Sequence, residues 1–231
     1  MSQLVIPGRV FWMTPTEFYE ESLRELKEKN ILLVMSLSNA KRLSLEKWVG
    51  LIGERSSLTW IDQISSNPTY VDLFEALSVF KEKPDLVFAI GGGSAIDLAK
   101  SCVGLSYLRS NHLFSKETVL NAILTKEYLD HPARIPIYAT PTTAGTGSEV
   151  TQWATLWDPE RGKKYSIDAP FLVPKRAYIV PEYTISMPPR LTLATGLDAL
   201  CQAVEAYWAR STSPMVKELA KVAIRLLVEY L

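Results

Sequence analysis

The chain has 231 residues, 47% of them hydrophobic, so it is long enough to bury one large core or two smaller ones. Lysine plus arginine and aspartate plus glutamate number 25 each, and this balance provides no net field to attract nucleic acid or an anionic membrane surface. The sequence has no apolar run of about 18 residues and no signal-peptide pattern at its start. We therefore expect a cytoplasmic globular protein with no nucleic-acid or membrane partner.

Helical and extended patterns alternate through the first half of the chain, which is typical of an α/β fold with a parallel sheet. Thr16 is expected to cap a first helix that carries Phe18 and Leu26. Asn67 and Pro68 are expected to begin a later helix, as cap and preset first turn. The other expected helices cover about 40–54, 94–108 and 116–127, and the expected strands are 31–37, 58–62, 86–90 and 134–139.

The pattern changes in the second half. DPERG (158–162) is a turn-like segment between QWATLW and KKYSI, which predicts a β-hairpin. From Pro188 onward two long helical patterns follow with no strand between them. The sequence therefore predicts an α/β domain over 1–185 and a partial helical domain over 186–231, because the chain stops within an amphipathic face at Leu231.

The two cysteines and the two histidines of the sequence give little indication of function. Cys102 and Cys201 are far apart and lack CxxC spacing, so we expect two buried thiols and no disulfide or cysteine metal site. His112 and His131 lie in polar segments far from the helical region. They are expected to be solvated loop residues.

The stretch AIGGGSAIDLAK (89–100) carries the first functional signal. A strand, a glycine turn and a helix beginning at Ser94 present free backbone N–H groups and the positive end of a helix dipole at one place, which suits a phosphate. Glycine permits the positive φ angles of a tight turn and leaves out the Cβ atoms that would hinder a pyrophosphate oxygen. The alternative is an ordinary turn in which Ser94 and Asp97 form a capping box.

PTTAGTGSEVT (141–151) follows another apolar strand. Because all strands of a parallel sheet point one way, this loop is expected to emerge at the same carboxyl edge as the glycines, where ligands bind in open α/β sheets. The two loops can then face one ligand. The alternative is an ordinary Ser/Thr-rich surface loop.

Asp198 and Gln202 are four residues apart and share one face of a helix, with Glu205 nearby. This spacing can bring an aspartate carboxylate and an amide oxygen to one metal ion. An aspartate that only complements the helix dipole is the alternative.

Together, AIGGGSAIDLAK, PTTAGTGSEVT and MPPRLTLATGLDALCQAVEAYW closely resemble the iron-containing (group III) alcohol dehydrogenase family, in order and spacing over nearly the whole chain. The resemblance implies an N-terminal dinucleotide-binding domain, a C-terminal helical domain and a divalent metal, iron or zinc, between them. It also implies NAD or NADP as cofactor and a small alcohol or aldehyde as substrate. A homo-oligomer is left open.

The same resemblance assigns roles by position. The residues that it places around the cofactor are Gly92, Gly93 and Ser94 at the pyrophosphate, Asp97 near the nicotinamide, Thr142, Thr143 and Thr146 along the cleft, Lys164 at the ribose and Asn67 beside the adenosine. It makes Asp198 the first metal ligand and gives the second ligand position to Gln202.

Three departures from the family pattern affect this interpretation. Ser36 stands where the family usually has an aspartate that accepts from the ribose hydroxyls, and without that carboxylate a 2′-phosphate is not repelled. Gln202 stands where the family has a histidine, and an amide oxygen is a poorer ligand for iron or zinc. The family's remaining ligands are histidines beyond Leu231, so we expect weak or absent turnover from these 231 residues.

Two classes of function follow. The first is an NAD(P)-dependent, metal-assisted oxidoreductase of small alcohols or aldehydes, with Gln202 suggesting the phosphonoacetaldehyde reductase-like subgroup. A glycerol dehydrogenase or dehydroquinate synthase-like relative is a further enzyme interpretation, and PTTAGTGSE favours the alcohol dehydrogenase branch. The second class is a nucleotide-binding module without catalysis.

Overall fold

A six-stranded parallel sheet forms the centre of the molecule. The computed structural model describes residues 8–80, 82–110 and 113–231. The sheet order is β1–β8–β5–β4–β2–β3, and each neighbouring pair is parallel. In chain order these strands are β1 (Arg9–Trp12), β2 (Asn30–Val34), β3 (Ser57–Ile61), β4 (Leu86–Gly91), β5 (Ile137–Pro141) and β8 (Arg176–Ile179).

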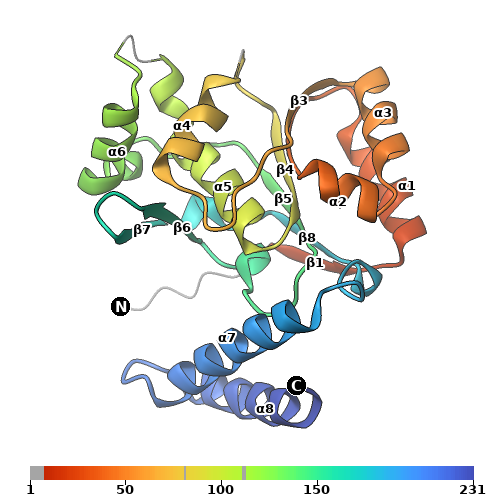
Figure 1. The fold of residues 1–231 in the computed structure, drawn as a ribbon, viewed down its shortest axis with the longest axis vertical. Helices are drawn as coiled ribbons and strands as arrows, with labels where there is room; N and C mark the ends of the chain where they lie inside the picture. The colour runs from red at the N-terminus through yellow and green to blue at the C-terminus, as the bar shows by residue number, and fades with distance from the viewer. Residues whose placement is uncertain (1–7, 81, 111–112) are drawn as a thin grey trace.

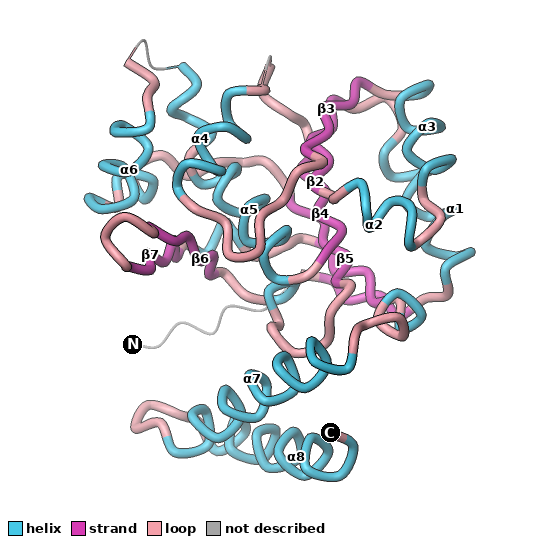
Figure 2. Tube along the Cα trace, in the orientation of Figure 1, coloured by secondary structure: helices cyan, strands magenta, loops and turns pink. Residues whose placement is uncertain are grey.

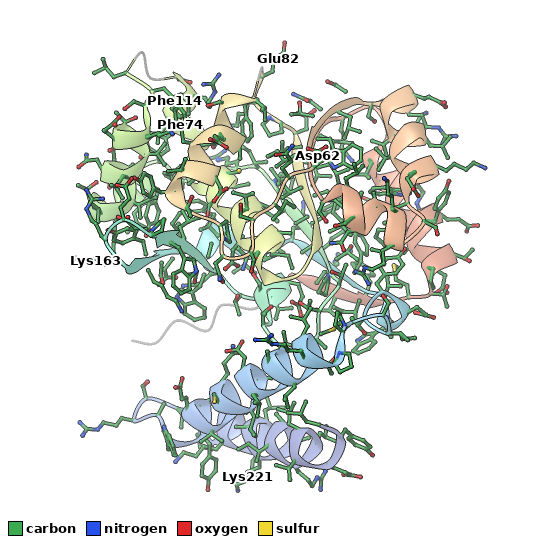
Figure 3. The ribbon with its side chains drawn as sticks, viewed as in Figure 1. Asp62, Phe74, Glu82, Phe114, Lys163 and Lys221 are labelled. Atoms are coloured by element: carbon green, nitrogen blue, oxygen red, sulfur yellow. The ribbon has the colours of Figure 1, made fainter. Side chains whose placement is uncertain are left out.

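Helices cover both faces of this sheet (Figures 1 and 2). One face packs against α1 (Pro15–Leu26), α2 (Leu37–Arg42) and α3 (Glu46–Arg55). The other packs against α4 (Tyr70–Ser78), α5 (Gly93–Gly104) and α6 (Lys116–Thr125). Phe74 of α4 and Phe114, just before α6, stack with ring centroids 4.9 Å apart (Figure 3).

The strand side chains explain why the apolar runs do not alternate with polar residues. In β2, Leu32 and Val34 belong to the buried cluster under α4, α5 and α6, whereas Ile31 and Leu33 belong to the cluster under α1 and α3. Successive side chains of a strand point to opposite faces, so a strand covered on both sides must be apolar at every position. The expected α/β class is confirmed.

Two smaller units follow in the second half. The predicted hairpin is present as β6 (Trp153–Asp158) and β7 (Lys163–Asp168), paired antiparallel. The predicted helices are α7 (Pro189–Trp208) and α8 (Pro214–Tyr230), which lie side by side below the sheet domain in Figure 1. None of the helices in the described residues is both long and apolar enough to span a membrane.

Helix starts were the least accurate predictions. The first helix is capped by Thr14 rather than Thr16, in a capping box with Glu17. Asn67 does not cap α4, because its φ of 59° is left-handed and Thr69 forms the capping box with Asp72 instead. In each case a threonine with an acidic residue three positions on was the correct signal.

Other differences are local. The expected helix over 40–54 is two helices, α2 and α3, separated by Ser44 with φ of 56°. Strands β1 and β8 were not predicted, since each has only four residues. Cys102 is buried as expected, but Cys201 is exposed on α7, which corrects that expectation. His131 is a half-exposed loop residue, and His112 lies outside the described residues.

Candidate functional site

Two loops meet at the carboxyl edge of the sheet, as predicted. Strand β4 leads into residues 91–94, the glycine corner, and its neighbour β5 leads into residues 142–148, the threonine loop. The backbone N–H of Thr142 donates to the carbonyl of Gly91 at 3.0 Å, which joins the two loops directly. The pairing of adjacent parallel strands therefore brings both polar segments to one place.

The glycine corner depends on close packing rather than on unusual backbone angles. Gly91, Gly92 and Gly93 are not among the residues with positive φ, so the expected left-handed turn is wrong. A Cβ added to Gly91 would lie 2.6 Å from the Cβ of Ala95. Added to Gly92 or Gly93 it would lie 3.1 Å from the side chain of Thr143 or Thr146, respectively. The threonine loop therefore leaves little room for a side chain at Gly92 and Gly93, and Ala95 of α5 leaves none at Gly91.

Helix α5 begins at this corner without a side-chain cap. Its N-cap is Gly92, which has no side chain to accept from the first N–H groups. The alternative capping box between Ser94 and Asp97 is therefore wrong; the Ser94 hydroxyl instead accepts from the backbone N–H of Asn67 at 3.3 Å. The first amides of α5 and the positive end of its dipole thus face the loop region without a side-chain partner.

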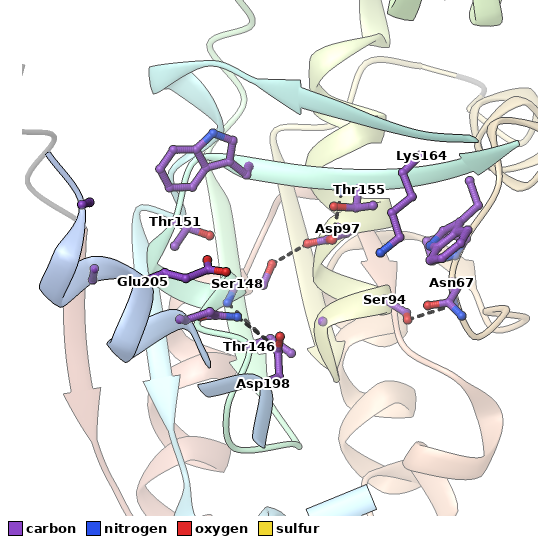
Figure 4. Close-up of a pocket in the computed structure, with 17 residues that line it drawn as sticks. Asn67, Ser94, Asp97, Thr146, Ser148, Thr151, Thr155, Lys164, Asp198 and Glu205 are labelled. Carbon is purple, nitrogen blue, oxygen red and sulfur yellow. Dashed lines mark hydrogen bonds between the residues drawn. The ribbon is translucent and has the colours of Figure 1, made fainter. Parts of the chain in front are cut away.

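A buried polar network ties α5 to the threonine loop and β6. The Lys100 ammonium group is fully buried and donates to the Ser148 hydroxyl at 3.1 Å, to the Thr151 hydroxyl at 3.3 Å and to the Trp153 carbonyl at 2.8 Å. The Ser148 hydroxyl in turn donates to Asp97 Oδ1 at 2.6 Å (Figure 4). All three ammonium donors of Lys100 have acceptors, so its charge is held without a direct ion pair.

Burial changes the ionisation of this network. It lowers the pKa of Lys100 to about 8 and raises the pKa of Asp97, although Asp97 also accepts from Ser148 and from the Thr155 N–H at 3.0 Å. Burial likewise raises the pKa of Glu149. Because both Asp97 oxygens are engaged, its carboxylate orients Ser148 and strand β6 rather than standing ready to abstract a proton.

Two cavities adjoin at the glycine corner. The first, here the α7 cavity, has a volume of about 850 Å³ and lies between the sheet edge and α7. The second, here the α2 cavity, has a volume of about 640 Å³ and extends from the glycine corner to α2. Asn67, Gly93, Ser94 and Thr146 line both cavities. Such adjoining hollows at a sheet edge suit a ligand with two bulky halves.

All eleven site residues predicted from the sequence line one or both cavities. Besides the four shared residues, the α2 cavity has Gly92, Thr142 and Thr143, and the α7 cavity has Asp97, Lys164, Asp198 and Gln202. The cavities differ in charge. The α7 cavity is lined by the carboxylates of Asp97, Asp198 and Glu205 and by Lys164, whose ammonium lies 4.4 Å from the centre of the Trp157 ring.

The candidate metal ligands lie together on α7 but do not form a complete site. Gln202 Nε2 donates to Asp198 Oδ2 at 2.9 Å, so the amide nitrogen rather than the oxygen faces the carboxylate. Within the described residues no group of three or more His, Cys, Asp or Glu side chains could hold a metal ion. Figure 4 shows Asp198 and Glu205 projecting from α7 toward the side that carries Ser148.

Sequence reasoning missed three polar residues of this region. Lys100 was visible only as a cation three positions after Asp97 in an otherwise apolar helix. Arg42 and Asn39 line the α2 cavity, but nothing in their local sequence indicated this. Their position follows from the short helix α2, which begins where β2 leaves the carboxyl edge of the sheet.

Comparison with known proteins shows what this chain is similar to. A family model, iron-containing alcohol dehydrogenase, matches residues 15–181. The chain is 36% identical to choline dehydrogenase of Bacillus subtilis, covering 74% of this chain and 41% of that protein. It is 32% identical to NADPH-dependent butanol dehydrogenase of Clostridium saccharobutylicum, covering 91% and 54%. The chain thus spans about half the length of these curated relatives.

Solved structures of other proteins are also similar to this chain over nearly its whole length. An iron-containing alcohol dehydrogenase of Thermotoga maritima superposes with a TM-score of 0.81 at 33% identity, covering 99% of this chain and 62% of that one. Sulfoacetaldehyde reductase of Bifidobacterium kashiwanohense, solved in complex with NAD+, has a TM-score of 0.81 at 25% identity, covering 100% and 59%.

Proposed function

The chain belongs to the iron-containing alcohol dehydrogenase family, and on that premise we propose that it binds NAD(H) or NADP(H) across the α2 and α7 cavities and serves hydride transfer to or from a small alcohol or aldehyde. One observation carries the proposal: the uncapped start of α5 opens where the two cavities join. A dinucleotide has a diphosphate between two bulky halves, and this arrangement matches that shape and charge.

The chain's own residues have separate tasks in this proposal. The first amides of α5, at Gly93 and Ser94, hold the diphosphate, and the side chain of Thr146 lines the same junction. Asp97 and Lys100 act as positioning residues, because their hydrogen bonds fix Ser148 in the lining of the α7 cavity. When bound, the nicotinamide supplies the hydride chemistry.

The residues of α7 offer too few ligands for an iron or zinc site. Asp198 and Gln202 remain the predicted ligands, but they offer two donors at most, and the amide nitrogen of Gln202 faces the carboxylate. Iron and zinc sites in proteins usually have three or more protein ligands. We therefore derive no step through a metal ion. The small number of donors on α7 favours a second candidate function, a nucleotide-binding module that lacks turnover by itself.

The substrate is proposed only as a class. The names of the relatives above refer to choline, butanol and sulfoacetaldehyde, which are small alcohols or aldehydes. Gln202, in place of a histidine, is the reason to include phosphonoacetaldehyde among the compounds to be tested.

Nucleotide binding can be measured directly. Trp153 and Trp157 line the α7 cavity, so energy transfer from tryptophan to a bound dihydronicotinamide should report the titration of NADH and NADPH. We expect saturable binding of at least one of them. Gly93→Val should weaken it about tenfold or more, since the new side chain meets Thr146, a loss of about 1.4 kcal/mol. Gly53→Val is the control, because nothing lies within 4 Å of a Cβ there.

Failure of both dinucleotides to bind a folded sample would refute the proposal. Aldehyde-dependent oxidation of the bound dihydronicotinamide then separates the two candidates. Turnover that requires Fe²⁺ or Zn²⁺ and disappears in Asp198→Ala supports the oxidoreductase. Binding without turnover supports the module.

A further inference from the structure

A third cavity lies at the edge of the sheet opposite to the candidate site. Its volume is about 450 Å³, and its walls come from the segment between α4 and β4, the 3-10 helix η1 (Ser106–Ser110) and the segment before β5. Because β4 and β5 begin there, we call it the amino-edge cavity. It shares no described residue with the α2 or α7 cavity. Glu82, one of its lining residues, lies at the other end of the molecule from α7 (Figures 1 and 3).

Cationic side chains outnumber carboxylates in the lining of this cavity. Arg109, Lys83 and His131 line it, and Glu82 is the single carboxylate among its described lining residues. His131 Nε2 lies 3.8 Å from Glu127 Oε1. Within the described ranges neither Arg109 nor Lys83 forms an ion pair with an Asp or Glu. The charges of these two cations are therefore not neutralised by the protein, and they are available to an anion.

Arg109 is oriented by neutral groups. Its Nη2 donates to the carbonyl of Phe80 at 3.1 Å, and its guanidinium carbon lies 4.8 Å from the centre of the Phe114 ring. Phe114 in turn stacks on Phe74 of α4. These contacts fix the guanidinium through one nitrogen and one face, so its other N–H groups remain available as donors. A guanidinium presents them in a planar fork that matches a carboxylate or a phosphate.

The same cavity has a wall of two stacked rings. Tyr107 and His131 both line it, with ring centroids 4.2 Å apart and an angle of 18° between the ring planes. The Tyr107 hydroxyl is buried and has no hydrogen-bond partner among the described residues. Burial and the nearby carboxylates of Glu127 and Asp130 raise the pKa of Tyr107, so its hydroxyl stays protonated and remains a donor. A flat ligand that carries an acceptor suits such a wall.

We propose that the amino-edge cavity binds a small organic anion in which a phosphate or carboxylate group is attached to a flat ring. The anionic group contacts Arg109 and Lys83, and the ring packs beside Tyr107 and His131. A volume of about 450 Å³ is that of a pocket for an organic ligand rather than for a bare ion. The site goes beyond the proposed function and does not depend on it, because the dinucleotide cavities lie at the other edge of the sheet.

The test measures equilibrium binding of phenyl phosphate and of benzoate by calorimetry and by NMR titration, with and without NADH. Both probes should bind saturably, and they should shift the amide signals of Tyr107, Ser110 and His131 whether or not NADH is present. Benzamide, the neutral isostere of benzoate, and inorganic phosphate, which lacks the ring, should each bind about tenfold or more weakly than the matching probe. The tighter of the two probes identifies the anionic group that the site prefers.

Variants of the two cations locate the binding. Arg109→Gln should weaken both probes about tenfold. Arg134→Gln is the matched control, since Arg134 is an exposed cation in the segment before β5 and does not line the cavity. It should change both affinities by less than about twofold. Lys83→Gln keeps the test decisive if Arg109→Gln does not fold, as judged by its thermal unfolding, and should weaken both probes about threefold.

The site is refuted if neither probe binds saturably, or if benzamide or inorganic phosphate binds as tightly as the matching probe. It is also refuted if no folded variant of Arg109 or Lys83 weakens binding. Displacement of the probes by NADH has the same meaning, because the probes then occupy the dinucleotide cavities. A protein that binds the probes as expected but does not bind NADH contradicts the proposed function alone.

Discussion

Lys100 is held by three hydrogen bonds beside the candidate site. It is a fully buried cation whose three donors reach Ser148, Thr151 and Trp153. A buried ammonium without a direct counter-ion costs free energy, which the structure offsets with hydrogen bonds. These hydrogen bonds fix α5, the threonine loop and the start of β6 in position relative to one another. Lys100 therefore acts on the cavity through other residues.

This burial predicts a pH-dependent stability. Since the pKa of Lys100 falls from 10.5 to about 8 on folding, the unfolded chain binds more protons than the folded one between these values. The free energy of unfolding should therefore gain a favourable contribution as pH rises from about 8 to 10.5, at most about 1.4 kcal/mol per pH unit. Urea unfolding of wild type and Lys100→Met across this range measures the contribution as the difference between the two curves. Parallel curves would contradict it.

At the level of elements, the threonine loop reaches from the sheet edge to α7. Gly145 has φ of 139° and packs so closely that a Cβ there would lie 2.2 Å from the carbonyl oxygen of Thr195 in α7. Gly147 also has a positive φ, 64°, but nothing lies within 4 Å of its Cβ position. Gly147 thus has a positive φ without a close contact, whereas Gly145 has both.

Alanine at these two positions should have unequal effects. Gly147→Ala should cost about 1 kcal/mol of stability from the left-handed backbone alone. Gly145→Ala should cost about 2–3 kcal/mol and also weaken dinucleotide binding, since the loop must move away from α7. Urea unfolding and the energy-transfer titration measure the two effects. Equal losses in both variants would show that the approach of the loop to α7 has no energetic role.

At the level of the whole molecule, the two buried clusters include residues of the six-stranded sheet, its covering helices and the β6–β7 hairpin, but none of α7 or α8. Their last members along the chain are Leu172 in one cluster and Tyr183 in the other. Helices α7 and α8 pack mainly on each other, and among their described residues Leu219, Leu226 and Val228 are exposed.

We therefore expect a chain shortened to residues 1–187 to fold. It keeps Ser186, which Arg42 contacts, and both buried clusters. Its thermal unfolding, followed by circular dichroism, should remain one cooperative transition within about 5 °C of that of the full chain. A chain that is unfolded, or that melts without cooperativity, would contradict the predicted boundary between residues 185 and 186.

The sequence by itself determined the α/β class and the position of the candidate site. Apolar runs such as 86–90, the three glycines and the Thr-rich segment are local patterns, and in a parallel sheet every strand of one direction ends at one edge. That topology places the loops after β4 and β5 at the same edge, and the pairing of β4 with β5 in the structure makes them neighbours. It does not require knowledge of any particular side-chain contact.

Only the tertiary structure decided what the individual side chains contact. Arg42 meets Tyr183 and Ser186, which are 141 and 144 residues away, and Lys100 meets Ser148 across 48 residues. The space for a side chain at the glycine corner is limited by Thr143 and Thr146 at Gly92 and Gly93 and by Ala95 at Gly91, while none of the three glycines has a positive φ. Such contacts depend on how elements distant in the chain pack together, and no local pattern of residues contains that information.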